Sequence, residues 1–127
     1  MRRTIIVAVV VFALAASACA AGSAALGGTV RRAEALGQQA AEAVRAGDFR
    51  TAVDRARGML TLWQAKWPVL ELLTAHDALS EVRGSIEDAL TCLEAGDALE
   101  GLRALGGTAA ALERIRIAES IRLMNLF

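Results

Sequence analysis

The sequence between Arg3 and Arg31 contains no charged residue. This run is about 27 residues long, and about 20 apolar residues suffice for a helix to cross a lipid bilayer. Its most apolar part, residues 5–14, is short, and mostly Ala, Ser and Gly follow it. Such a segment predicts a helix that directs the rest of the chain to a membrane or across it.

Three alternatives remain open for how this segment is processed. We favour an uncleaved transmembrane anchor. The small residues at positions 16–18 also resemble the cleavage site of a secretory signal. They precede Cys19, which would be lipidated in a lipoprotein, although Ala stands three positions before it in place of the usual Leu. All three alternatives place the following residues outside the cytoplasmic membrane. Arg2 and Arg3 favour an N-terminus inside, and Arg31 and Arg32 at the other end of the segment weaken this argument.

The chain therefore divides into residues 1–30, a signal peptide or membrane anchor, and residues 31–127, one extracytoplasmic domain. In the domain, apolar residues recur three or four positions apart, which indicates amphipathic helices. No segment alternates with period two, so strands are not expected. Three apolar stripes follow this spacing: Phe49, Val53, Ala56, Leu60, Trp63 and Trp67; then Leu79, Val82, Ile86, Ala89 or Leu90, and Leu93; then Leu102, Leu105, Ala109, Leu112 and Ile115.

Two similar stretches, "EAVRAGDFRTAVDRA" and "TCLEAGDALEGLRAL", predict the turns between helices. Gly47 and Gly96 can adopt the left-handed conformation that ends a helix, and Asp48 and Asp97 can cap the next one. The prediction is an all-α fold in which a membrane or signal helix precedes a small antiparallel bundle of two αα-hairpins. The hairpins are expected to pair residues 31–46 with 48–66 and residues 77–95 with 97–124.

Both tryptophans, the only lysine, the only proline and the only histidine lie between Trp63 and His76. Pro68 is expected to break or kink the helix there, with a short helical turn at 68–74 joining the hairpins. Trp63 lies deeper in the apolar stripe and is expected in the core, whereas Trp67 at the helix end is expected to be more exposed. His76 is expected to close this corner by a hydrogen bond, with Glu119 as one candidate acceptor.

Catalytic, metal and nucleic-acid chemistry are not expected. Acidic and basic residues balance at 14 each, without a basic stripe that would neutralise phosphates. A lone histidine without neighbouring cysteines or several carboxylates does not make a zinc site, and the sequence has no nucleophile or phosphate-loop motif. We therefore expect no enzymatic activity, no cofactor and no metal.

From Trp63 to the C-terminus the sequence resembles the domain-of-unknown-function family numbered 4363, small bacterial proteins with one N-terminal membrane segment. The residues that carry the resemblance are Trp63, Trp67, His76, Glu119, Asn125, Leu126 and Phe127. The family usually ends in Asn-Ile-Phe, and this chain ends in Asn-Leu-Phe. The resemblance implies a membrane-anchored helical protein and no particular reaction, cofactor or ligand.

The expected function is a protein-interaction module that binds another membrane or envelope protein. The C-terminal "IRIAESIRLMNLF" places apolar residues on more than one helix face, which a soluble helix does not need. The candidate partner-binding residues are Trp63, Trp67, His76, Leu126 and Phe127. The alternative is a sensor or carrier domain that holds a small apolar ligand between the hairpins; the oligomeric state stays open.

Overall fold

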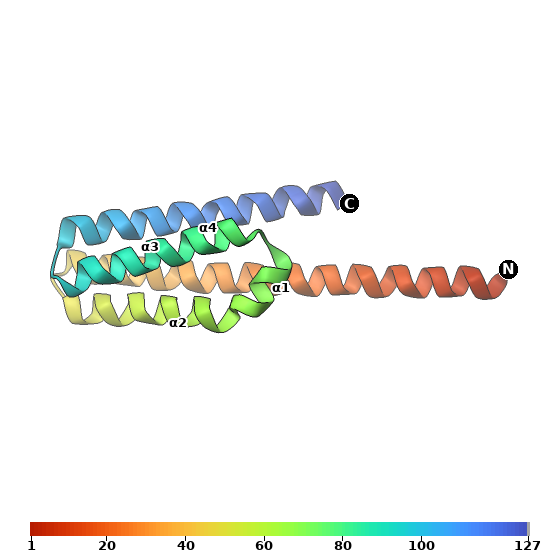
Figure 1. The fold of residues 1–127 in the computed structure, drawn as a ribbon, viewed down its shortest axis with the longest axis horizontal. Helices are drawn as coiled ribbons and strands as arrows, with labels where there is room; N and C mark the ends of the chain where they lie inside the picture. The colour runs from red at the N-terminus through yellow and green to blue at the C-terminus, as the bar shows by residue number, and fades with distance from the viewer. Residues whose placement is uncertain (127) are drawn as a thin grey trace.

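The computed structural model describes residues 1–126, and their side chains as far as Asn125. It contains four helices: α1 (Arg2–Arg45), α2 (Phe49–Leu73), α3 (His76–Glu94) and α4 (Ala98–Leu126). The helices α1 and α2 form one antiparallel hairpin, and α3 and α4 form the other (Figure 1). Contacts between α2 and α3 and between α1 and α4 close the four helices into a bundle. The predicted all-α fold with two αα-hairpins is confirmed.

The two hairpin turns share one backbone structure, as their matching sequences predict. Gly47 and Gly96 have φ angles of 77° and 74°, a region in which a Cβ would be strained. In the first turn, the amide of Gly47 donates to the carbonyl of Val44 at 3.0 Å, and the amide of Asp48 donates to that of Ala43 at 2.8 Å. These bonds satisfy carbonyls at the end of α1 that have no partner within the helix.

The aspartate after each glycine caps the next helix. The amide of Thr51 donates to Asp48 Oδ1 at 3.1 Å, and the amide of Glu100 donates to Asp97 Oδ1 at the same distance. Asp48 also accepts a hydrogen bond from the Thr51 hydroxyl at 2.6 Å. Both hydrogen bonds from Thr51 favour the ionised carboxylate and so hold the pKa of Asp48 below its ordinary value. The Thr51 hydroxyl has the larger effect and the Thr51 amide the next.

The core consists mainly of Leu, Val, Ile and Ala, and Trp63 is its largest side chain. All members of the stripe predicted on α3 are buried, with Ala89 rather than Leu90 at the position that was left open. On α4, Thr108 is buried in place of the predicted Ala109, which is exposed. The Thr108 hydroxyl avoids an unsatisfied buried group by donating to the carbonyl of Ala104 at 3.0 Å.

The buried face of α2 is centred one position away from the predicted stripe. Ala52, Ala56 and Met59 are fully buried, whereas Phe49 and Val53 are only half-buried. α2 packs on α1 and α3, and the small side chains of Ala52 and Ala56 let the neighbouring helices approach closely.

The prediction of a separate short helix at 68–74 is wrong, because α2 continues through Pro68 to Leu73. Proline cannot donate to the carbonyl of Gln64, four residues earlier, but all other helix bonds near it can form. The missing bond lies close to the end of α2, and the last part of α2 bends towards α3 in Figure 1. The corner between the hairpins is therefore a bent helix end and not a break.

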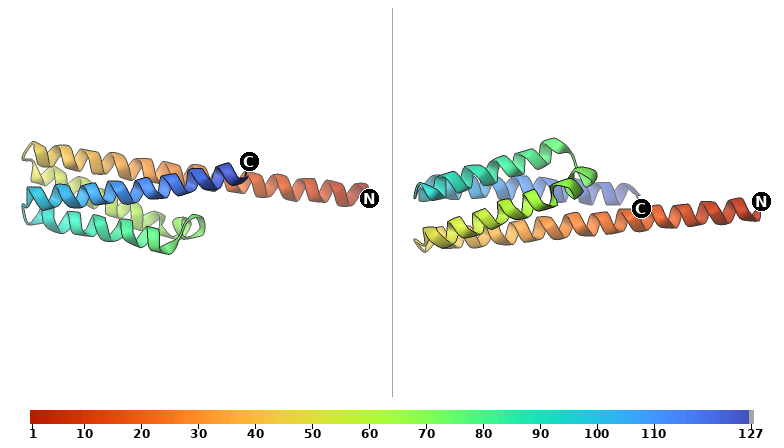
Figure 2. Two further views of the ribbon diagram at one scale, coloured as in Figure 1. Left: turned by 90° about the horizontal axis from the view of Figure 1, so that it is seen from above. Right: turned by 60° about the horizontal axis from the view of Figure 1, so that its bottom comes forward.

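Helix α1 runs without interruption from the uncharged segment into the bundle. Leu26, Thr29 and Val30 are already buried among the other helices, so packing begins before residue 31. The first 15 residues are all exposed and project as a rod from one end of the bundle (Figure 2). We call this the near end; it also contains the α2–α3 connection and the last turns of α4. The far end contains the two hairpin turns at Gly47 and Gly96.

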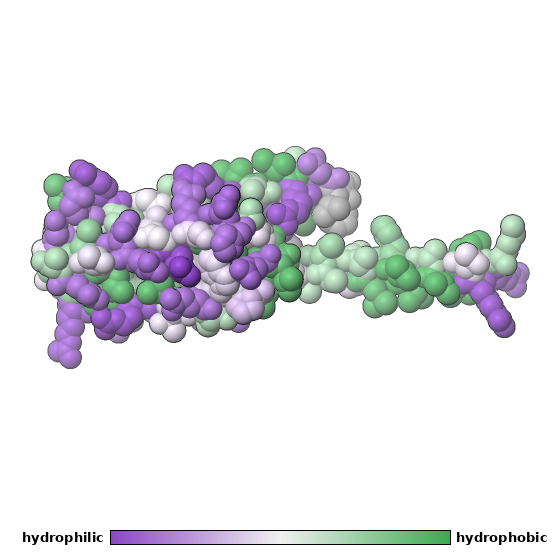
Figure 3. All heavy atoms as spheres, in the orientation of Figure 1, coloured by the Kyte–Doolittle hydropathy of each residue, from purple (hydrophilic) through white to green (hydrophobic). Residues whose placement is uncertain are grey.

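The projecting rod is apolar on its surface, apart from its N-terminal tip, whereas polar residues cover much of the bundle (Figure 3). In the part of the chain that the structure describes, α1 is the one helix long and apolar enough to cross a membrane by length and composition. Its position at the N-terminus is consistent with either a membrane anchor or a signal sequence.

Candidate interaction surfaces

Trp63 lies in the core with no exposed surface. Its indole N–H donates to the carbonyl of Leu79 on α3 at 3.1 Å, which satisfies the one polar atom of the side chain. Trp63 therefore ties α2 to the first turn of α3. It belongs to the core, as its place in the stripe predicts, and not to a partner-binding surface.

Trp67 is partly exposed, as predicted, and three side chains surround it. Its indole N–H donates to Glu71 Oε1 at 2.7 Å. The ring of His76 meets it edge to face at a centroid distance of 5.7 Å, and the Arg83 guanidinium lies 5.4 Å from its centroid. Both contacts suit an aromatic face, which carries partial negative charge.

His76 has a different partner from the one considered in the sequence. Its Nδ1 lies 3.5 Å from Glu71 Oε1, and its Nε2 lies 3.4 Å from the Ser80 hydroxyl. The expected pairing with Glu119 is wrong, because the α2–α3 connection brings the end of α2 to His76 first. Glu119 instead lies 3.5 Å from Arg122 Nη1 on its own helix.

The last turns of α4 expose large apolar side chains. Ile117, Ile121 and Met124 are 49%, 54% and 77% exposed, so they cannot be explained as core. The side chain of Leu126 and all of Phe127 lie outside the described residues, so these two candidates stay predictions.

The structure brings the α2–α3 corner and the end of α4 together at the near end. Arg122 of α4 donates to the carbonyl of Leu73, the last residue of α2, at 2.6 Å. This bond satisfies a carbonyl at a helix C-terminus, where a positive charge is also favourable. Val69 and Leu72 on α2 are 47% and 86% exposed at the same end. The two regions that the sequence singled out separately thus form one apolar end of the bundle, next to the projecting rod.

A groove between α1 and α4 was not predicted. It has a volume of about 440 Å³. Its floor is apolar and includes Met59, Leu105 and Leu112, which the other helices bury from behind. Small residues lower its walls: Ala33, Gly37 and Ala41 on α1, and Gly106 and Ala109 on α4. The four-residue spacing on α1 was visible in the sequence, but the pairing of α1 with α4 was not.

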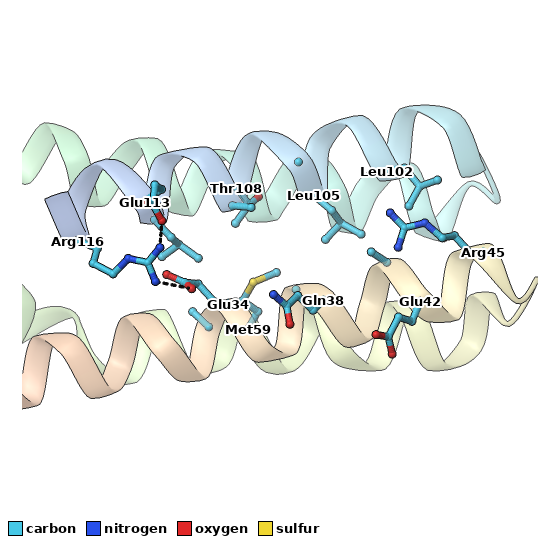
Figure 4. A pocket seen from close by; sticks show the side chains of 16 residues that line it. Glu34, Gln38, Glu42, Arg45, Met59, Leu102, Leu105, Thr108, Glu113 and Arg116 are labelled. Atoms are coloured by element: carbon cyan, nitrogen blue, oxygen red, sulfur yellow. Dashed lines mark hydrogen bonds and ion pairs between the residues drawn. The ribbon is translucent and has the colours of Figure 1, made fainter.

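Charged side chains stand along the rim of the groove, as Figure 4 shows. Arg116 reaches from α4 to Glu34 of α1 at 3.3 Å and also pairs with Glu113, so these three residues bridge the groove on the side of the near end. Glu42 and Arg45 of α1 lie along the rim towards the far end. The groove therefore offers an apolar floor between ionic edges.

The remaining candidate, Cys19, is exposed on α1 between the rod and the first buried residues. No group of three or more His, Cys, Asp or Glu side chains gathers as a metal site within residues 1–126.

Comparison with models of protein families, with curated proteins and with solved structures gives no match to the chain. The resemblance to family 4363 therefore stays a prediction from the residues named above, and the function must be argued from the surfaces themselves.

Proposed function

We propose that the protein is a membrane-tethered interaction module whose α1–α4 groove binds a helix of another membrane or envelope protein. In this proposal α1 is an uncleaved anchor with its N-terminus in the cytoplasm, and the bundle lies outside the cytoplasmic membrane. The proposal assigns the chain no enzymatic activity. The main support for the proposal is the groove, because one of its two walls is α1, the same helix that is proposed as the anchor.

The groove has the properties of a seat for a helix. Gly37, Ala41, Gly106 and Ala109 leave its walls low, and small residues let the backbone of a partner helix approach closely. Its apolar floor would bury apolar side chains of the partner, each worth about 1.5–3 kcal/mol when fully removed from water. The rim charges can select a partner with complementary charges and fix its register.

The continuity of α1 favours a partner that is itself bound to the membrane. Because α1 has no break between the uncharged segment and the groove, a partner helix that rises beside the anchor would meet the groove without a flexible connection. Confinement of both proteins to one bilayer raises their effective concentration, so a modest groove can support a stable association.

The test uses two neighbouring exposed alanines on α4. Ala109 lines the groove, whereas Ala110 is exposed but does not line it. Ala109→Trp fills the groove, and we expect it to reduce the amount of partner that co-purifies with the full-length chain from solubilised membranes by at least about tenfold, or 1.4 kcal/mol. Ala110→Trp is the matched control and should retain the partner.

Both variants should melt within a few degrees of the wild type, because neither position is buried. Equal co-purification with both variants would contradict the proposal, and so would equal loss with both. Quantitative mass spectrometry of the purified complexes distinguishes these outcomes.

A second candidate function uses the same groove. Its volume of about 440 Å³ falls within the roughly 300–1,000 Å³ typical of small-molecule pockets, and its floor is apolar. The bundle would then be a sensor or carrier for a small apolar ligand. Native mass spectrometry of the full-length chain tests this: a small molecule bound to the wild type and to Ala110→Trp, but absent from Ala109→Trp, would favour the ligand over the partner helix.

A further inference from the structure

We propose that the near end of the bundle sits in the headgroup layer of the lipid bilayer, with exposed apolar side chains of α2 and α4 reaching the edge of the hydrocarbon. The inference rests on the anchor in the proposed function, but it concerns a different surface from the groove. It assigns a lipid contact to the bundle itself, in addition to the lipid contact of the anchor.

Two contacts place the ends of α2 and α4 at one level along α1. A Cβ on Gly22 of α1 would come within 2.7 Å of Leu73 Cδ2, so α1 touches the end of α2 at this residue. The carbonyl of Leu73 accepts the hydrogen bond from Arg122 at 2.6 Å. Gly22, Leu73 and Arg122 therefore mark one cross-section of the near end.

The length of α1 places this cross-section at the edge of the bilayer. A helix rises 1.5 Å per residue, so the 18 residues from Ile5 to Gly22 span about 27 Å. The hydrocarbon core is about 30 Å thick. Arg2 and Arg3 hold the start of the helix on the cytoplasmic side, and no flexible linker separates the anchor from the bundle. No flexible segment is therefore present that would let the bundle lie at a distance from the membrane surface.

The side chains at this level suit lipid better than water. Leu72 is 86% exposed and directly precedes Leu73, while Ile121 and Met124 flank Arg122 with 54% and 77% exposure. The chain beyond Arg122 carries no further charged side chain. α4 also extends past the α2–α3 connection along the projecting part of α1 (Figures 1 and 2). Large apolar surfaces left open at this level would be covered by the membrane.

Two cations lie further from the rod than this cross-section: Arg32 is ten residues, or about 15 Å, beyond Gly22 along α1, and its long side chain can extend back towards lipid phosphates. A hollow between α1 and α2 has a volume of about 330 Å³ and is lined by Arg32 and Lys66, without an acidic side chain. Long basic side chains favour such a depth because their stems contact apolar surface while their charges meet phosphates. Of the acidic groups at the near end, Glu71 contacts Trp67 and His76, and Asp77 is exposed to water. Glu119 Oε2 is buried without a hydrogen bond and lies 3.5 Å from Arg122 Nη1.

The test measures the surroundings of nitroxide labels on the full-length chain in phosphatidylcholine vesicles. Labels are attached at Leu72→Cys and Met124→Cys, in a background in which Cys19 and Cys92 are replaced by serine and alanine. Leu99→Cys is the matched control, because Leu99 is a leucine 68% exposed at the far end. Each variant is first floated with the vesicles, which tests the anchor separately from the position of the bundle.

We expect the labels at residues 72 and 124 to be several-fold less accessible than the label at 99 to a water-soluble nickel chelate, and at least as accessible to oxygen. High nickel accessibility at all three positions in a floating chain would overturn the inference and leave the anchor intact. Low accessibility to both reagents at 72 and 124 would also overturn it, because a second copy or another protein would then cover this end. A chain that does not float would refute the anchor itself.

Discussion

Replacing Trp63 by alanine should destabilise the bundle more than any other single change at the α2–α3 corner. The side chain is fully buried, and a buried tryptophan removes about 150–250 Å² from water. At about 25 cal/mol per Å² this corresponds to about 4–6 kcal/mol, close to the 3–5 kcal/mol typical of such truncations. The hydrogen bond to Leu79 adds about 1 kcal/mol within that total. A domain of this size has a stability of about 5–15 kcal/mol, so Trp63→Ala should come close to unfolding it.

Comparison of Trp63→Ala with Trp67→Ala tests whether Trp63 is the centre of the core. Trp67 is partly exposed, and its contacts with His76 and Arg83 are each worth about 0.5–1.5 kcal/mol, so we expect a loss of about 1–3 kcal/mol. Trp63→Phe keeps most of the volume and should fall between the two alanine variants. Urea unfolding of the full-length chain in mild detergent, followed by far-ultraviolet circular dichroism, gives all three values. Equal losses for Trp63→Ala and Trp67→Ala, or a larger loss for Trp67→Ala, would show that Trp63 is not the centre of the core.

Alkaline phosphatase fused after Phe127 should be active, and a reporter that works only in the cytoplasm should be inactive there; the reverse result would contradict export. Cys19→Ser should leave the protein in the membrane fraction, whereas its release would indicate a lipid anchor. Asp97→Ala should lower stability by about 1 kcal/mol in a urea titration through loss of the helix cap; no change would contradict that role. At pH values well above 3.8, its ordinary pKa, the Asp48 carboxylate should contribute its full stabilisation of the fold. This contribution should be lost as the pH falls through the lowered pKa that Asp48 has in the folded state. The difference in urea midpoint between the wild type and Asp48→Asn should therefore shrink in acid, and a constant difference would contradict the role of the charge.

Local signals in the sequence predicted most of the fold. Gly47 and Gly96 needed a positive φ that few other residues adopt, so both hairpin turns followed from short stretches. The α3 stripe was also correct, because its large apolar side chains and Ala89 recur at the three- and four-residue spacing that one helix face requires. Pro68 was expected to break or kink the helix; α2 bends near its end but is not broken, because a missing hydrogen bond costs little near a helix end that has other packing partners. Its cost depends on tertiary contacts, which the local sequence does not contain.

The candidate surfaces were less predictable, since they depend on which helices become neighbours. Trp67 is more exposed than Trp63, as expected, but not because it ends the helix, since α2 continues to Leu73. The bond from Arg122 to Leu73 joins residues 49 positions apart, and nothing in the spacing of either helix indicates it. The α1–α4 groove arises in the same way, because Gly37 and Gly106 leave a space only when their two helices lie side by side.

The anchor is the claim on which both proposed surfaces depend, and the intact mass of the protein extracted from membranes tests it most directly. If α1 remains whole, mass spectrometry should give the full chain of 127 residues, with a mass of 13.3 kDa. A smaller mass that corresponds to a chain beginning at or after Cys19, with or without an added lipid, would contradict the account, because the rod that places the bundle at the bilayer would then be absent from the mature protein.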